Sequence, residues 1–243
     1  MLVIKDLCKR IIYGKIPSSY IFMFHHLQSY PSIKLSNCTL NQYIFSSILE
    51  NIFSFDVCAT LEETVKYPHR RKIAITFDDG LEDVYNIAYP LCNKFKLPFT
   101  VFIVPDFVDK EGYMKTEQIV ELSANPLVHI GSHGMSHKIL KNLPEADITY
   151  EVVRSRHVLE DITGKTVDLF AYSHGLFDYR VFNIVASNYK YAFGTKPRPC
   201  NILTTINKYD VPRFNIDDSC ILERSEFINS YSKGILNIPN KYR

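Results

Sequence analysis

Short apolar runs rich in β-branched and aromatic residues alternate along this chain with segments of helical periodicity, and this alternation restricts the fold more than any other feature. The apolar runs lie at residues 20–24, 72–77, 99–104, 127–131, 167–172 and 189–193. The helical segments lie at residues 40–53, 82–95, 116–122, 145–163 and 179–187. Strands that are apolar throughout and alternate with helices are typical of a parallel sheet covered by helices. The pattern therefore predicts an α/β fold, either a barrel or a doubly wound sheet.

The polar residues that follow the predicted strands favour a barrel. They come directly after the apolar runs, and they are His25, His26, Asp78, Asp79, His133 and the segment 172–174. In a (β/α) barrel the carboxyl ends of all strands meet at one mouth, so side chains from separate strand ends become neighbours.

Composition limits the classes of function. The chain has 28 Lys and Arg against 26 Asp and Glu, so it lacks the basic excess that nucleic-acid binding needs. No repeat or Gly/Ser linker divides it, which predicts one domain over residues 1–243. Its 6 cysteines show no paired spacing, which favours a reducing cytoplasm. Neither a membrane span nor a secretory signal is predicted.

The segment at residues 2–13 has an amphipathic helical pattern. Its apolar residues gather on one side, with Lys5, Lys9 and Arg10 elsewhere around the helix. We expect this helix to pack on the body of the domain. Peripheral contact with an anionic membrane surface is the alternative.

Two adjacent carboxylates, Asp78 and Asp79, follow the apolar run at 72–77 and precede Gly80. Neighbouring side chains at a strand end diverge, so one carboxylate can hold a metal while the other faces a reacting water. An Asp-Gly turn with an aspartate capping the next helix is the alternative interpretation.

Two histidines, His133 and His137, are spaced so that both imidazoles can reach one ion. Together with Asp79 they form a set of two histidines and one carboxylate that leaves coordination positions open. Such a set suits a hydrolytic zinc site, or another divalent metal, at which water is activated.

The segments Thr-Phe-Asp-Asp-Gly at 76–80 and His-x-x-x-His at 133–137 resemble the first two motifs of the polysaccharide deacetylase family, also called NodB homology or carbohydrate esterase 4. The resemblance spans about residues 20–217. It implies a distorted (β/α) barrel of about seven parallel strands and a divalent metal, usually Zn²⁺, with Co²⁺ or Ni²⁺ as alternatives. It also implies Asp78 as general base and Asp79, His133 and His137 as metal ligands.

The third family motif reads Arg-Pro-Pro-Tyr-Gly or Ala-Tyr-Pro-Tyr-Gly, and here the segment 171–175 is Ala-Tyr-Ser-His-Gly. The resemblance makes Tyr172 and His174 candidates for oxyanion or substrate contacts, with the backbone N–H of His174 as the oxyanion donor. The arginine that begins the Arg-Pro-Pro-Tyr-Gly variant is replaced here by Ala171. Arg213, in a Pro-Arg segment, is the candidate for the missing cation beside Asp78, and a surface arginine is the alternative.

Cleavage of an amide also needs an acid for the leaving amine. Many family members use a late histidine, but no histidine follows Asp217. A branch that deacetylates exported poly-glucosamine has an early Tyr-His motif in this role. His25, after Phe24, is the match and is therefore the predicted general acid; a structural hydrogen bond is the alternative role.

The residue pattern therefore predicts a metal-dependent hydrolase. The family resemblance implies that it removes the N-acetyl group from an amino sugar in bacterial surface polysaccharide biosynthesis. Without a secretory signal, a nucleotide-linked or lipid-linked precursor is expected, met in the cytoplasm or at the inner face of the membrane. The alternatives are an O-acetyl esterase, a deformylase, or a carbohydrate-binding protein that has lost turnover.

Overall fold

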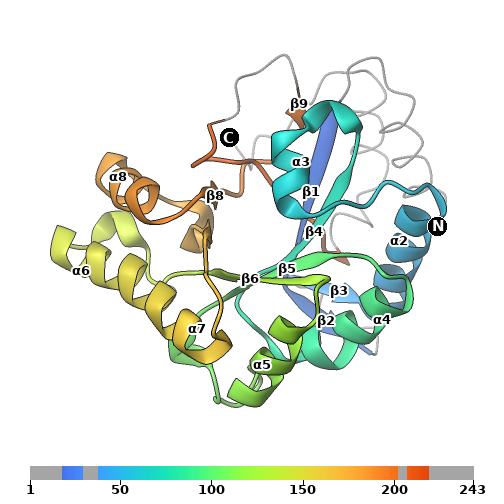
Figure 1. Ribbon diagram of the computed structural model, residues 1–243, viewed down its shortest axis with the longest axis horizontal. Helices are drawn as coiled ribbons and strands as arrows, with labels where there is room; N and C mark the ends of the chain where they lie inside the picture. The colour runs from blue at the N-terminus through green and yellow to red at the C-terminus, as the bar shows by residue number, and fades with distance from the viewer. Residues whose placement is uncertain (1–17, 30–37, 202–206, 219–243) are drawn as a thin grey trace.

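The structure is a computed structural model that describes residues 18–29, 38–201 and 207–218 (Figure 1). The amphipathic segment predicted at residues 2–13 lies outside these ranges.

The centre of the molecule is a curled parallel sheet with strand order β10-β1-β4-β5-β6-β7-β8. The strands are β1 (Ser18–Phe24), β4 (Ile73–Phe77), β5 (Phe99–Ile103), β6 (Val128–Ser132), β7 (Leu169–Ala171), β8 (Tyr191–Phe193) and β10 (Phe214–Asn215). All neighbours in this order pair in parallel. The predicted distorted barrel of about seven parallel strands is thus confirmed.

The barrel is closed by the short segment at residues 211–215. Val211 bridges Phe193 at the end of β8, and three residues later Phe214 pairs with Phe22 of β1. The segment therefore joins the two edges of the sheet, and Arg213 lies between the two contacts. Shorter strands lie outside this order: β9 (Cys200–Asn201) pairs antiparallel with β1, and β2 (His26–Gln28) pairs with β3 (Thr39–Asn41).

Helices surround the outside of the sheet (Figure 1). They are α2 (Gln42–Ser54), α3 (Leu61–Lys66), α4 (Tyr89–Lys94), α5 (Thr116–Ala124), α6 (Glu145–Thr149), α7 (Ser155–Thr163) and α8 (Tyr179–Asn188). Side-chain caps begin several of them. Asn41 accepts the Tyr43 N–H at α2, and Asp178 accepts two N–H groups at α8.

Short helical turns fill several connections. The 3₁₀ turns are η1 (Pro68–Arg70), η3 (Pro105–Phe107), η4 (Leu140–Asn142) and η6 (Ser173–Gly175). Two π-helical turns, η2 (Val84–Ala88) and η5 (Tyr150–Arg154), interrupt the helices predicted at 82–95 and 145–163. Such turns are frequent near functional sites.

The apolar core has two parts. The larger lies between the sheet and the helices, and a smaller cluster fills the barrel interior with Ile21, Ala74, Phe102, Phe193 and Val211 among its members. Strand side chains alternate between the two parts because successive residues point to opposite faces. No helix in the described part of the chain is long and apolar enough to cross a membrane.

Candidate active site

The carboxyl end of β4 carries the two aspartates on a loop of unusual conformation. Asp78 donates its N–H to the Phe24 carbonyl at 3.0 Å, which extends the β1–β4 pairing by one residue. Asp79 and Gly80 then have φ angles of 74° and 77°. A non-glycine residue in this left-handed region is strained, and such strain is concentrated at functional sites. The turn separates the two carboxylates.

Asp79, His133 and His137 converge at this edge of the sheet, with potential ligand atoms that all lie within 4.8 Å of one another. Asp79 Oδ1 lies 3.3 Å from Nε2 of His137 and 3.6 Å from Nε2 of His133. His133 is fixed by a 2.8 Å hydrogen bond from Nδ1 to the Ala171 carbonyl. Since a carbonyl only accepts, Nδ1 is the donor in this bond, and Nε2 is the ring nitrogen left to face the metal-ligand cluster.

The three side chains fit a divalent metal by their chemistry. Oδ1 of Asp79 is buried and accepts no hydrogen bond from any described residue, which is the state of a carboxylate oxygen that needs a cation. Burial, followed by the neighbouring His133, lowers the pKa of His137 to about 4, so its imidazole is neutral at physiological pH. Two imidazoles and one carboxylate are a common ligand set for zinc and other hydrolytic metals.

Asp78 forms a buried ion pair with Arg213. Nη1 and Nη2 of Arg213 donate to the two oxygens of Asp78 at 2.7 and 2.8 Å, and both side chains are buried. Nε of Arg213 donates to the Gly194 carbonyl, and its guanidinium lies 5.2 Å from the ring centre of Phe102. The predicted cation beside Asp78 is therefore present, and Arg213 is not a surface residue.

This arrangement keeps Asp78 ionised. Burial alone would raise its pKa, but the charge of Arg213, then that of His133, and the Arg213 hydrogen bonds outweigh burial and lower the pKa to about 2. Asp78 Oδ2 lies 3.8 Å from Nε2 of His133, beside the metal ligands. A carboxylate in this position can accept a proton from a water bound at the same site.

His25 follows β1 at the same edge. The β1–β4 register pairs Phe24 with Phe77, so the next residues, His25 and Asp78, lie side by side. Nδ1 of His25 is buried and has no hydrogen-bond partner among the described residues. His26 instead turns away and contacts Asp83, which also accepts the Leu27 N–H.

The two candidate residues of the third motif, Tyr172 and His174, lie in different surroundings. Tyr172 does not face the site: its hydroxyl donates to the Tyr209 carbonyl, its N–H to the Phe193 carbonyl, and its side chain is fully buried. Because both polar groups are used within the fold, Tyr172 has no group for substrate, which corrects its predicted contact role. His174 is exposed, and its ring centre lies 4.5 Å from that of His137.

Residues that sequence reasoning missed support the loop between the two histidines. Ser173 donates its hydroxyl to the His133 carbonyl at 2.9 Å. Glu151, from the π-turn η5, accepts N–H groups of Met135 and Ser136. The signal for Glu151 was its place on the buried stripe of the helix at 145–163, where an acid is unusual.

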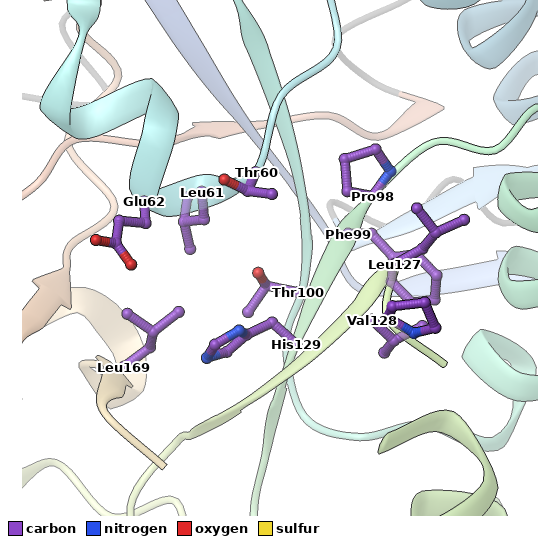
Figure 2. A pocket seen from close by; sticks show the side chains of 11 residues that line it. Thr60, Leu61, Glu62, Pro98, Phe99, Thr100, Leu127, Val128, His129 and Leu169 are labelled. Atoms are coloured by element: carbon purple, nitrogen blue, oxygen red, sulfur yellow. The ribbon is translucent and has the colours of Figure 1, made fainter. Parts of the chain in front are cut away.

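A separate hollow lies at the opposite end of the strands. Figure 2 shows its lining, in which Thr60 and Leu61 of the α3 start face Thr100 and His129 near the amino ends of β5 and β6. Its volume is about 160 Å³. It contains no member of the metal-ligand set, and active sites of (β/α) barrels lie at the carboxyl ends of the strands.

Comparisons with known proteins agree with this geometry. The polysaccharide deacetylase family profile matches residues 66–193, which include both the aspartates and the histidine pair. The poly-beta-1,6-N-acetyl-D-glucosamine N-deacetylase of Staphylococcus aureus is 27% identical over 208 residues, covering 77% of this chain and 71% of the relative.

Solved structures show the same fold. A polysaccharide deacetylase from Bacillus cereus superposes with a TM-score of 0.77 at 24% identity, covering 88% of this chain and 69% of that one. A Streptococcus pyogenes deacetylase solved with acetate gives a TM-score of 0.75 at 19% identity, covering 87% of this chain and 100% of that one. From its motifs, its fold and the profile match over more than half of its length, the chain belongs to the polysaccharide deacetylase family.

Proposed function

We propose that this protein is a metal-dependent hydrolase that removes the N-acetyl group from an N-acetylated amino sugar during synthesis of a bacterial surface polysaccharide. One observation carries the proposal. The ligand set of Asp79, His133 and His137 lies beside Asp78, a carboxylate that Arg213 keeps ionised. Hydrolysis of an amide by a metal-bound water requires metal ligands and, next to them, an ionised general base.

A divalent metal bound by Asp79, His133 and His137 would acidify a water and polarise the substrate carbonyl. Asp78 would accept the proton of the attacking water. Arg213 would orient this carboxylate through both of its oxygens, so that the base is already in place when substrate binds.

Two further groups would complete the reaction. The ring of His174 lies beside that of His137, and the backbone N–H of His174 would donate to the oxygen of the tetrahedral intermediate. His25, with its unpartnered Nδ1, would give a proton to the leaving amine of the sugar. Because an amide ion is a poor leaving group, this proton is needed for amides more than for esters.

The substrate class is supported by the staphylococcal relative, whose name states that it acts on poly-β-1,6-N-acetyl-D-glucosamine. We propose an N-acetylglucosamine residue of a surface glycan, or of its precursor, as the acyl donor. The proposal covers three forms of this sugar: a polymer, a nucleotide-linked precursor and a lipid-linked precursor, the last two met at the cytoplasmic face. The chemistry at Asp78 is the same for each.

The test is acetate release by the zinc- or cobalt-loaded protein from β-1,6-linked N-acetylglucosamine oligomers, UDP-N-acetylglucosamine and a lipid-linked N-acetylglucosamine. O-acetylated and N-formylated sugars serve as competing substrates. We expect acetate from an N-acetyl substrate only when metal is present. Preferential cleavage of the O-acetyl or N-formyl sugars would contradict de-N-acetylation. A protein that binds no metal even after reconstitution, and releases no acyl group, would indicate a carbohydrate-binding protein.

A further inference from the structure

Glu151 is a buried carboxylate that faces the loop between the two candidate metal-binding histidines. It lies in the π-turn η5 and is 3% exposed. Lys138 is a cation that contacts it, with Nζ 3.8 Å from Oε1 on a side chain that is 61% exposed. A buried carboxylate is costly unless it is well hydrogen-bonded, so its other contacts must account for its position.

Those contacts all go to the histidine loop. Oε2 accepts the N–H groups of Met135 and Ser136 at 2.9 and 2.8 Å, and Oε1 accepts the Ser136 hydroxyl. Hydrogen bonds to an ionised acceptor are about twice as strong as neutral ones. One side chain therefore binds three donors on the residues that separate His133 from His137.

The loop has a conformation that needs such support. Gly134 and His137 have φ angles of 78° and 60°, so the chain passes through the left-handed region twice within four residues. Ser173 adds a second support, because its hydroxyl donates to the His133 carbonyl. A Cβ added at Gly134 would lie 3.4 Å from Ser173 Oγ and 3.6 Å from Glu151 Oε2, so both side chains pack closely against this residue of the loop.

We infer that Glu151 is a positioning residue of the metal centre, which fixes the loop at 134–136 so that Nε2 of His133 and Nε2 of His137 meet at Asp79. This inference rests on the proposed metal-dependent function. Glu151 does not touch the ligand atoms themselves. Its effect is on metal affinity, because without it the two imidazoles would have to be ordered at the moment of binding.

The chemistry of the contacts predicts how substitutions should rank. Glu151→Ala leaves two loop N–H groups without their acceptor, and loss of such outer-shell partners typically weakens metal affinity about 10–100-fold. In Glu151→Gln the amide oxygen can still accept both N–H groups, while the Ser136 hydroxyl rotates to accept from the amide NH₂. We therefore expect Glu151→Gln to stay within about tenfold of wild type, well above Glu151→Ala.

The experiment is a titration of the metal-free protein with Co²⁺, followed by visible absorption, and with Zn²⁺ in competition with a chelator. Both are done well below the melting temperature of the metal-free protein. Glu160→Ala is the matched control, because Glu160 also accepts a backbone N–H, that of Val167 at 3.1 Å, but far along α7 from the histidine loop. Ser136→Ala removes only the hydroxyl contact and serves if Glu151→Ala does not fold.

Weaker Co²⁺ and Zn²⁺ binding in Glu151→Ala, a smaller loss in Ser136→Ala and wild-type affinity in Glu160→Ala would support the inference. Equal affinity for wild type and both loop variants would overturn it and leave the proposed function standing. An equal loss in Glu151→Gln and Glu151→Ala would also overturn it, since charge rather than loop geometry would then be responsible. Failure of the wild-type protein to bind either metal would instead refute the proposed metal-dependent function.

Discussion

Asp78 and Asp79 are neighbours in the sequence but have different surroundings, and this difference assigns their roles. Asp78 is 2% exposed and bound through both oxygens by Arg213, whereas Asp79 has a buried oxygen without a donor among the described residues. Asp78→Asn is expected to reduce acetate release by about 10²–10⁴-fold, the usual contribution of a general base. Metal content, measured on the same sample by emission spectrometry, is expected to stay at the wild-type level.

Asp79→Asn is the matched control for that variant, since it should lower metal content and activity together. Loss of metal from Asp78→Asn with retention in Asp79→Asn would show that the two roles are exchanged.

His25 gives a second prediction at the scale of single residues. If His25 supplies the proton for the leaving amine, His25→Ala should depress cleavage of an N-acetyl sugar far more than cleavage of an activated acetate ester, whose leaving group needs no acid. The ratio of kcat/KM for the two substrates is the measurement, with His26→Ala as control because His26 contacts Asp83 instead. Similar losses on both substrates would remove His25 as the acid.

The residues with direct chemical roles were easier to predict than those that hold them. Carboxylates and imidazoles after strands can be identified from their position, and Arg213 from its Pro-Arg segment. Tyr172 could not be placed, because its contact with the Tyr209 carbonyl joins residues 37 positions apart. Glu151 was missed because its partners are backbone N–H groups, which every residue except proline offers.

Among the elements, β2 is tied to the start of the helical segment before η2 by the contact between His26 and Asp83. The hydrogen bond to Asp83, against a smaller opposing effect of burial, raises the pKa of His26 above 6.5. A raised histidine pKa stabilises the fold fully below the unfolded value, and this stability is lost as pH rises through the folded value. The melting temperature of wild type should therefore exceed that of His26→Gln more at about pH 6 than at about pH 9. A difference that does not change with pH would contradict a charged pair.

Packing between β5 and β6 also reaches the site. A Cβ at Gly131 would lie 2.5 Å from the ring of Phe102, and Phe102 lies beneath the Arg213 guanidinium that binds Asp78. Gly131→Ala should therefore destabilise the protein by about 1–3 kcal/mol, measured by urea unfolding. In a Phe102→Leu background, which makes room for the methyl group, the same substitution should cost less. Equal costs in both backgrounds would show that the contact with Phe102 is not the cause.

The parallel strands and most helices could be predicted because they are long enough to show a period. The predicted helix at 145–163 is divided into α6, η5 and α7, and a single π-turn of this kind leaves no separate mark in the helical period of the sequence. The helix α3 has 6 residues, too few to show a stripe. Likewise, β10 has 2 residues and is defined by its pairing with β1.

At the scale of the whole molecule, the barrel brings together residues from distant parts of the chain, and a metal would connect them. Asp79 follows β4 and the two histidines follow β6, so a bound metal should stabilise the folded state over the unfolded chain. At a free zinc concentration 100-fold above Kd the gain is about 2.7 kcal/mol. We expect a higher melting temperature with zinc than with chelator. The Asp79→Ala variant should show little of this shift, and an equal shift in that variant would place the metal elsewhere.

The most direct test of the account is to remove metal from the purified protein with a chelator and then measure acetate release from a β-1,6-linked N-acetylglucosamine oligomer as zinc or cobalt is added back. The account predicts no release from the metal-free protein, and release that rises with added metal until the single site of Asp79, His133 and His137 is filled. Release that persists in the metal-free protein, or a metal-loaded protein that frees acetate from no N-acetylated sugar, would contradict it.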